Sequence, residues 1–176
     1  MSKLIPVFLT LALLSNSMVA QAQPLASKCL GIKEETLSKK TIIRKFPTFN
    51  IQLEIAENTN AIQMTEGSIL IVDRGTYKYL KCLETNGRVF GRDIFGLLIS
   101  KGTESYPINE QLPNRPSTYI VATKDYKSMA LRFIFDNGNT DISLYGGGPL
   151  ESKQEVKDEL DSLLKILKAV TFLSNY

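Results

Sequence analysis

Short segments with the length of single strands recur along most of the chain, and this pattern limits the possible folds more than any other sequence feature. The segments alternate between apolar and polar residues or are continuously apolar, and they are rich in β-branched and aromatic residues, which is typical of strands. They span 41–46, 49–56, 68–73, 76–83, 88–91, 94–100, 117–124, 128–136 and 140–145. Asn86-Gly87 and Asn137-Gly138 are typical hairpin dipeptides, and Arg74-Gly75 lies where another tight reversal fits. The pattern therefore predicts a mostly antiparallel sheet.

Alternation within two of these segments predicts which side chains face the core. In the segment 128–136, Arg132 is expected to point outward. The residues expected to face inward are Ile51, Leu53, Ile55, Leu131, Phe133 and Phe135.

The C-terminal part of the chain has a helical pattern instead. Ser152 and Glu155 have the spacing of a capping box, in which each residue satisfies a free backbone N–H of the first turn. Apolar residues then recur at helical spacing, at Val156, Leu160, Leu163, Leu164 and Leu167. We expect a helix over about 153–168, packed on the sheet, and a short closing strand over 170–173. The predicted fold class is α+β, with a mostly antiparallel, twisted or barrel-like β-sheet and one long C-terminal helix.

This ending resembles a known family. The helix followed by Leu167-Lys-Ala-Val-Thr-Phe172 is similar to the closing segment of PsbP/Mog1-like domains, small α/β sheet proteins that include extrinsic subunits of photosynthetic membranes. Phe46-Pro-Thr-Phe-Asn-Ile51 is similar to the start of such a domain. The family has a helix in the middle of its domain, whereas no capped helical run is present between 85 and 150. No functional residue follows from this resemblance.

The N-terminus has the pattern of a secretory signal peptide. Lys3 supplies a positive charge, residues 4–14 are largely apolar, and Ala20-Gln21-Ala22 places small residues before the expected cleavage site. We expect a signal peptide over 1–22 and a single mature domain over 23–176, located in the periplasm or outside the cell. The alternative is an uncleaved anchor, but a span needs about 20 apolar residues. No later apolar run is long enough for a transmembrane segment.

Two cysteines are present, which allows a single intramolecular pairing. Exported chains reach compartments in which thiols oxidise. We therefore expect a structural disulfide between Cys29 and Cys82 that attaches the N-terminal region to the segment 76–83. The alternative, a redox-active pair, is typical of cysteines two residues apart.

Composition excludes several classes of function. Histidine is absent, so catalysis by Ser-His-Asp or Cys-His groups and histidine-based zinc sites are excluded. The net charge of +3 is too small to indicate nucleic-acid binding. The segment Asp136–Asp141 lacks the ligand spacing of a calcium loop, and Gly146–Pro149 lacks the Gly-Lys-Ser/Thr of a phosphate-binding loop. No catalytic residue, cofactor or metal is predicted.

Two regions are candidates for contact with a partner. Tyr77 and Tyr79 share one face of the predicted strand 76–83, and they either form an exposed contact surface or pack beneath the C-terminal helix. The proline-rich stretch 101–117 is the longest expected loop, and long loops in compact domains are often functional.

The sequence thus predicts a small exported protein of non-catalytic binding or accessory function, with a protein or a small molecule as its partner. One alternative is a carrier that holds a small apolar ligand between sheet and helix. Another is a hydrolase, for which carboxylates are available at Asp73, Glu84, Asp93 and Asp125. Because the inward residues are bulky, we expect the seam between sheet and helix to be filled and to contain no large pocket.

Overall fold

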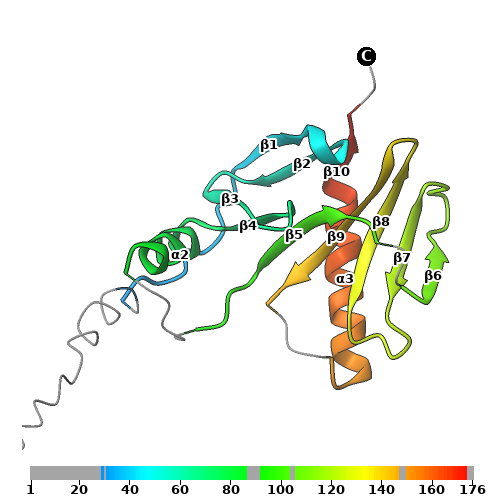
Figure 1. Cartoon of the computed structure of the whole chain (residues 1–176). Coiled ribbons are helices and arrows are strands. Elements are labelled where there is room, and N and C mark those ends of the chain that lie inside the picture. The colour runs from blue at the N-terminus through cyan, green and yellow to red at the C-terminus, as the bar shows by residue number, and fades with distance from the viewer. Residues whose placement is uncertain (1–28, 30, 87–91, 104–105, 147–149, 174–176) are drawn as a thin grey trace, which may run out of the picture.

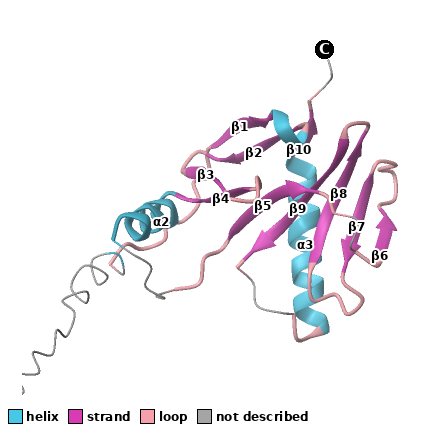
Figure 2. Ribbon diagram, viewed as in Figure 1, coloured by secondary structure: helices cyan, strands magenta, loops and turns pink. Residues whose placement is uncertain are grey.

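The computed structural model describes residues 29, 31–86, 92–103, 106–146 and 150–173. Within these residues the strands form two antiparallel sheets, and a long helix lies near the C-terminus (Figures 1 and 2). The α+β fold with mostly antiparallel sheet is confirmed. The predicted signal peptide and the predicted strand 88–91 lie outside the described residues.

The smaller sheet has the strand order β1-β2-β10. Its strands are β1 (Thr41–Phe46), β2 (Ile51–Ala56) and β10 (Val170–Phe172). The short 3-10 helix η1 (Pro47–Phe49) connects β1 to β2, and Asn50 closes this turn with a φ of 55°. Asparagine adopts such a left-handed conformation more readily than most residues. Because β10 pairs with β2, the last described strand joins the first hairpin.

The larger sheet has the order β3-β4-β5-β9-β8-β7-β6. Its strands are β3 (Thr59–Gln63), β4 (Ile69–Asp73), β5 (Gly96–Lys101), β6 (Ile108–Gln111), β7 (Thr118–Ala122), β8 (Met129–Phe135) and β9 (Gly138–Tyr145). A hairpin joins β8 and β9 as predicted, but Phe135 pairs with Gly138, so its two turn residues are Asp136 and Asn137 and Gly138 begins β9. The expected loop 101–117 is interrupted by β6, so that part of the prediction was wrong.

Helix α3 (Lys153–Ala169) agrees closely with the prediction from the capping box. The Ser152 Oγ accepts a hydrogen bond from the Glu155 N–H at 3.2 Å, and the Glu155 carboxylate accepts one from the Glu151 N–H at 2.7 Å. Leu163 and Leu167 are its buried residues. In the described part of the chain, no helix combines the length and the apolar character needed to cross a bilayer.

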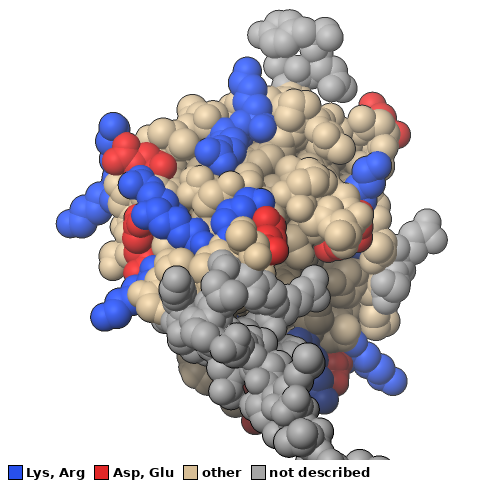
Figure 3. Space-filling view, turned by 60° about the vertical axis from the view of Figure 1, so that its left-hand side comes forward, with Lys and Arg blue, Asp and Glu red and all other residues tan. Residues whose placement is uncertain are grey.

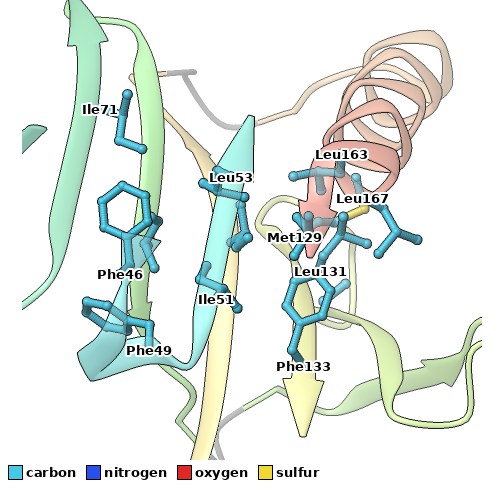
Figure 4. Close-up of a cluster of buried hydrophobic side chains, with 14 residues drawn as sticks. Phe46, Phe49, Ile51, Leu53, Ile71, Met129, Leu131, Phe133, Leu163 and Leu167 are labelled. Carbon is cyan, nitrogen blue, oxygen red and sulfur yellow. The ribbon is translucent and has the colours of Figure 1, made fainter. Parts of the chain in front are cut away.

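The core lies where α3 and the smaller sheet cover the same face of the larger sheet (Figures 1 and 4). Leu163 of α3 and Leu53 of β2 belong to one buried cluster with Leu131 and Phe133 of β8. The other fully buried large side chains of this cluster include Phe49, Ile51, Ile99, Met129 and Ile142. The expected seam between α3 and the sheet is therefore filled.

Arg132 was predicted to point outward, and its side chain does point away from the core cluster, but it is not exposed. It lies on the sheet face opposite α3, where it is buried and pairs across the strands with Asp141. Two parallel hydrogen bonds of 2.8 Å join the guanidinium to the carboxylate. The Thr103 carbonyl accepts a further hydrogen bond from Arg132, and Tyr106 lies over the guanidinium at 5.6 Å. The segment after β5 thus covers this pair, which alternation alone does not reveal.

The predicted strand 76–83 and the reversal at Arg74-Gly75 were also wrong. These residues form helix α2 (Arg74–Asn86), which follows β4 directly (Figure 2). The Asp73 carboxylate accepts a hydrogen bond from the Thr76 N–H at 3.0 Å, and this is the contact that an N-cap residue makes with the third helical residue. The cap at Asp73 therefore starts a helix where the alternation of tyrosines indicates a strand.

The predicted disulfide between Cys29 and Cys82 is present, with the two Cα atoms 5.7 Å apart. It attaches the N-terminal region to helix α2 and not to a strand. The structural role of this bond stays a prediction.

Candidate ligand-binding cleft

An open cleft of about 530 Å³ lies where the smaller sheet, strands β4, β5 and β9 of the larger sheet, and α3 meet. Its volume falls within the range of about 300–1,000 Å³ that is typical of small-molecule sites. The lining residues are Glu34, Glu35, Leu37, Glu54, Ile55, Ala56, Thr59, Ile71, Val72, Asp73, Phe95, Gly96, Leu97, Leu144 and Ile166. The cleft is open and lies beside the filled seam, so it is a surface feature and not the large internal pocket that the sequence argues against.

The floor of the cleft is a row of apolar side chains that crosses three strands. Ile71 of β4 pairs with Leu97 of β5, which pairs with Leu144 of β9. Residues paired in this way lie on the same face of a sheet. Ile55 of β2 and Ile166 of α3 also line the cleft, from the two elements that cover this face. The floor remains open because neither element covers the whole row, and Leu144 is 39% exposed.

Two apolar side chains from outside the strands complete the lining. Leu37 is 59% exposed and Phe95 is 57% exposed, which are high values for side chains of this kind. Asn58 fixes the segment that carries Leu37, because it accepts a hydrogen bond from the Ser38 N–H and donates one to the Thr36 carbonyl.

Gly96 lets Phe95 approach the sheet. A Cβ at Gly96 would lie 2.6 Å from the Ile71 carbonyl oxygen, which is far below normal contact. A glycine is therefore needed for the chain to enter β5 at this place.

Four carboxylates line the cleft, those of Glu34, Glu35, Glu54 and Asp73, and each of them has a partner. Glu35 forms ion pairs with Lys78 at 3.3 Å and Arg74 at 3.8 Å, and Glu34 lies 4.0 Å from Arg92. Asp73 accepts hydrogen bonds from the backbone of Glu35 and from Thr76.

The carboxylates of Asp73 and Glu54 are held by hydrogen bonds, and Asp73 is not suited to act as a general acid. Burial of Asp73 opposes its ionisation, but these hydrogen bonds outweigh it and hold the pKa of Asp73 below its ordinary value. Glu54 accepts a hydrogen bond from the Thr41 hydroxyl. A general acid near neutral pH needs a raised pKa, so Asp73 is suited to a structural role.

A second hollow of about 410 Å³ adjoins the cleft and shares Phe95, Gly96 and Leu144 with it. Its other lining residues are Lys127, Ser128, Met129, Ser143, Tyr145 and Glu159. Glu159 lies on α3, and burial raises the pKa of its carboxyl.

The candidate tyrosine surface differs from the prediction. Tyr79 is 1% exposed, and the Arg92 guanidinium lies 4.5 Å from its ring centre. Tyr77 is half-buried on α2, with the Lys81 ammonium 5.9 Å from its ring. The pair does not form an exposed aromatic face, because side chains two residues apart point in different directions on a helix. Tyr79 instead anchors α2 against the rest of the molecule.

Charged side chains of both signs are intermixed on the face shown in Figure 3. Near the start of β1, for example, Lys40 forms an ion pair with Glu57 at 2.9 Å. Among the residues that the structure describes, no group of three or more acidic or cysteine side chains is placed to hold a metal ion.

The cleft was not predicted from the sequence. Strand alternation could place Ile55 on the inner face, but it could not show that Ile71, Leu97 and Leu144 align across three strands. Leu37 carried a signal, because it is a large apolar residue outside the predicted strands, whereas Phe95 fell within the predicted strand 94–100 and lies before β5 in the structure.

Comparisons with known protein families, curated proteins and solved structures found no match for this chain. The similarity of the C-terminal segment to PsbP/Mog1-like domains stays a prediction.

Proposed function

We propose that this chain is an exported, non-catalytic binding protein, and that a small, largely apolar ligand occupies the cleft. The observation that carries this proposal is the concentration of exposed apolar side chains in one place. Leu37, Phe95 and Leu144 are three of the few large apolar residues that are substantially exposed, and all three line the same cleft.

Exposure of apolar surface costs free energy of about 25 cal/mol per Å² relative to burial. A ligand that covers these side chains recovers part of this free energy, and the cleft has a suitable volume. The disulfide between Cys29 and Cys82 supports the exported location, because disulfides persist in oxidising compartments.

The carboxylates of the cleft give less support to the alternative of a hydrolase. Glu35 and Asp73 are held by partners in the folded protein, as described above. A glycosidase-type mechanism needs one carboxyl with a raised pKa and one free carboxylate across a bound substrate. Asp73 has a lowered pKa, so this cleft favours binding over acid–base catalysis.

The proposal can be tested with N-phenyl-1-naphthylamine, a fluorophore that is uncharged at neutral pH and becomes brighter in apolar sites. We expect saturable binding to the mature protein, with about one fluorophore per chain. Leu144→Gln should weaken binding about tenfold, because a polar amide replaces apolar surface at the centre of the floor.

Ile134→Gln is the matched control. Ile134 is 41% exposed, close to the 39% of Leu144, and it lies outside the cleft and the adjoining hollow. Its substitution should leave fluorophore binding unchanged. Both variants are first checked for native folding by thermal unfolding. Absent binding to the wild type, or equal weakening by the two variants, would refute the assignment of the cleft and favour an accessory role with a protein partner.

A further inference from the structure

The cleft and the adjoining hollow form one extended site. They adjoin at three shared residues, Phe95, Gly96 and Leu144, so a ligand that lies over these residues reaches both spaces. Ile166 lines the cleft and Glu159 lines the hollow, and both lie on α3. A separation of seven residues places them on the same side of a helix, about 10.5 Å apart along its axis. A ligand that fills both spaces is therefore elongated and lies along α3.

Carboxylates outnumber basic residues in the lining of the extended site. Five carboxylates line it, those of Glu34, Glu35, Glu54, Asp73 and Glu159, and Lys127 is the one lysine or arginine among the lining residues. The whole chain has a net charge of +3. Lys127 is itself paired with Asp125 at 3.3 Å. Because Glu34 and Glu35 are already paired with Arg92, Lys78 and Arg74, a cationic ligand group is complemented by the carboxylates without a basic partner, among them Glu159.

Glu159 differs from the other carboxylates of the site in its surroundings. Glu34 and Glu35 have cationic partners, and Asp73 and Glu54 accept hydrogen bonds. In the described part of the chain, no hydrogen bond or ion pair reaches the half-buried carboxyl of Glu159. Burial is the cause that raises its pKa, and a cation bound beside it would favour the ionised form and lower this pKa. A half-buried carboxyl without a partner at the end of an apolar site is suited to bind the charged end of a ligand.

We infer that the ligand is an amphipathic amine. Its apolar chain lies over the paired residues Leu97 and Leu144, and its ammonium group lies at Glu159. This inference rests on the proposed binding function and specifies the class of ligand. The ammonium donates hydrogen bonds to the Glu159 carboxylate, while the chain covers Leu144 and Phe95.

Three probes of equal chain length test the inference: decylamine, decanol and decanoate, each below its micelle concentration at pH 7.5. They compete with the fluorophore for the mature wild-type protein. We expect decylamine to bind at least about fivefold more tightly than decanol, because a charge-assisted hydrogen bond adds to the apolar contact. Decanoate should bind most weakly, since its carboxylate meets like charges.

The variant Glu159→Gln removes the charge and keeps the shape of the side chain. It should reduce the preference for decylamine over decanol to below about twofold, while decanol binds as before. The matched control is Asp161→Asn, which removes an exposed carboxylate from α3 outside both hollows and should retain the preference.

The outcomes separate this inference from the proposed function. If decanol binds as tightly as decylamine, the ligand class is wrong and the apolar site stands. If none of the three probes displaces the fluorophore, the apolar site itself is refuted, and the ligand class with it. If Asp161→Asn abolishes the preference as fully as Glu159→Gln does, the preference reflects general charge and not a contact with Glu159.

Discussion

Asp73 joins three parts of the molecule through one carboxylate. It ends strand β4, caps helix α2 through the Thr76 N–H at 3.0 Å, and accepts a hydrogen bond from the Glu35 N–H at 2.7 Å. The last contact holds the N-terminal segment against the start of α2. Because each bond favours the ionised carboxylate, they together outweigh its partial burial and lower the pKa of Asp73.

Replacement of Asp73 by alanine should therefore lower the free energy of unfolding by about 1–2 kcal/mol, the typical effect of losing an N-cap. Urea unfolding at pH 7 measures this value. Asp73→Asn is the control, because asparagine is also a good N-cap and should be milder. The folded pKa is lowered, so the contribution of the charge is complete above the ordinary pKa of 3.8 and is lost as the pH falls through the lower folded value. An equal loss of stability in both variants would contradict the assigned role of the carboxylate in capping.

At the scale of elements, the two helices show what the sequence could and could not predict. Helix α3 was predicted within one residue, because a capping box and a leucine stripe agree with each other. Helix α2 was missed because Tyr77 and Tyr79 alternate with lysines as they would in a strand. The available helical signal was the N-cap at Asp73 with Thr76 three residues later. It involves two residues, whereas the alternating pattern extends over 76–83.

The strands were predicted better than their arrangement. Local alternation indicates that β8 and β9 are strands, but it contains no information about which distant strand lies beside each of them. The pairing of β5 with β9 brings Leu97 beside Leu144 from far along the chain. The candidate site depends on such pairings and on how much of the sheet α3 leaves uncovered. Neither can be read from the sequence, so the site was found only in the structure.

The two kinds of leucine on α3 should differ in their contribution to stability. Leu163 is fully buried against the sheet, whereas Leu160 is partly exposed. We expect Leu163→Ala to lower the free energy of unfolding by about 2–5 kcal/mol, because it leaves a cavity in the core. Leu160→Ala should have a smaller effect, since solvent already reaches that side chain. Urea unfolding of both variants compares them, and an equal loss would mean that the seam is packed differently from the structure described here.

At the scale of the whole molecule, α2 and the N-terminal segment pack together at one end of the larger sheet, and the two are named the attachment (Figure 1). Several contacts fix it besides the disulfide. Arg92 donates hydrogen bonds to the Ile32 carbonyl and the Thr76 hydroxyl, both at 3.1 Å, and its guanidinium packs over Tyr79. The main core, built from α3, β2 and β8, lies elsewhere and includes none of these residues. The attachment and the core should therefore respond differently when the covalent link is removed.

The double variant Cys29→Ala/Cys82→Ala tests this separation. The link closes a loop of 53 residues, and its removal gives the unfolded chain more conformational freedom, which costs about 4 kcal/mol in the loop-entropy description. We expect a large drop in the free energy of unfolding, together with faster hydrogen exchange in α2, while amides of β8 and β9 stay the best protected. The wild type under reducing conditions should behave like the variant, because both lack the bond. Unchanged stability of the variant would mean that Arg92, Tyr79 and Asp73 hold the attachment without covalent help. Equal acceleration of exchange in α2 and in β8 would instead show that the attachment and the core unfold as one unit.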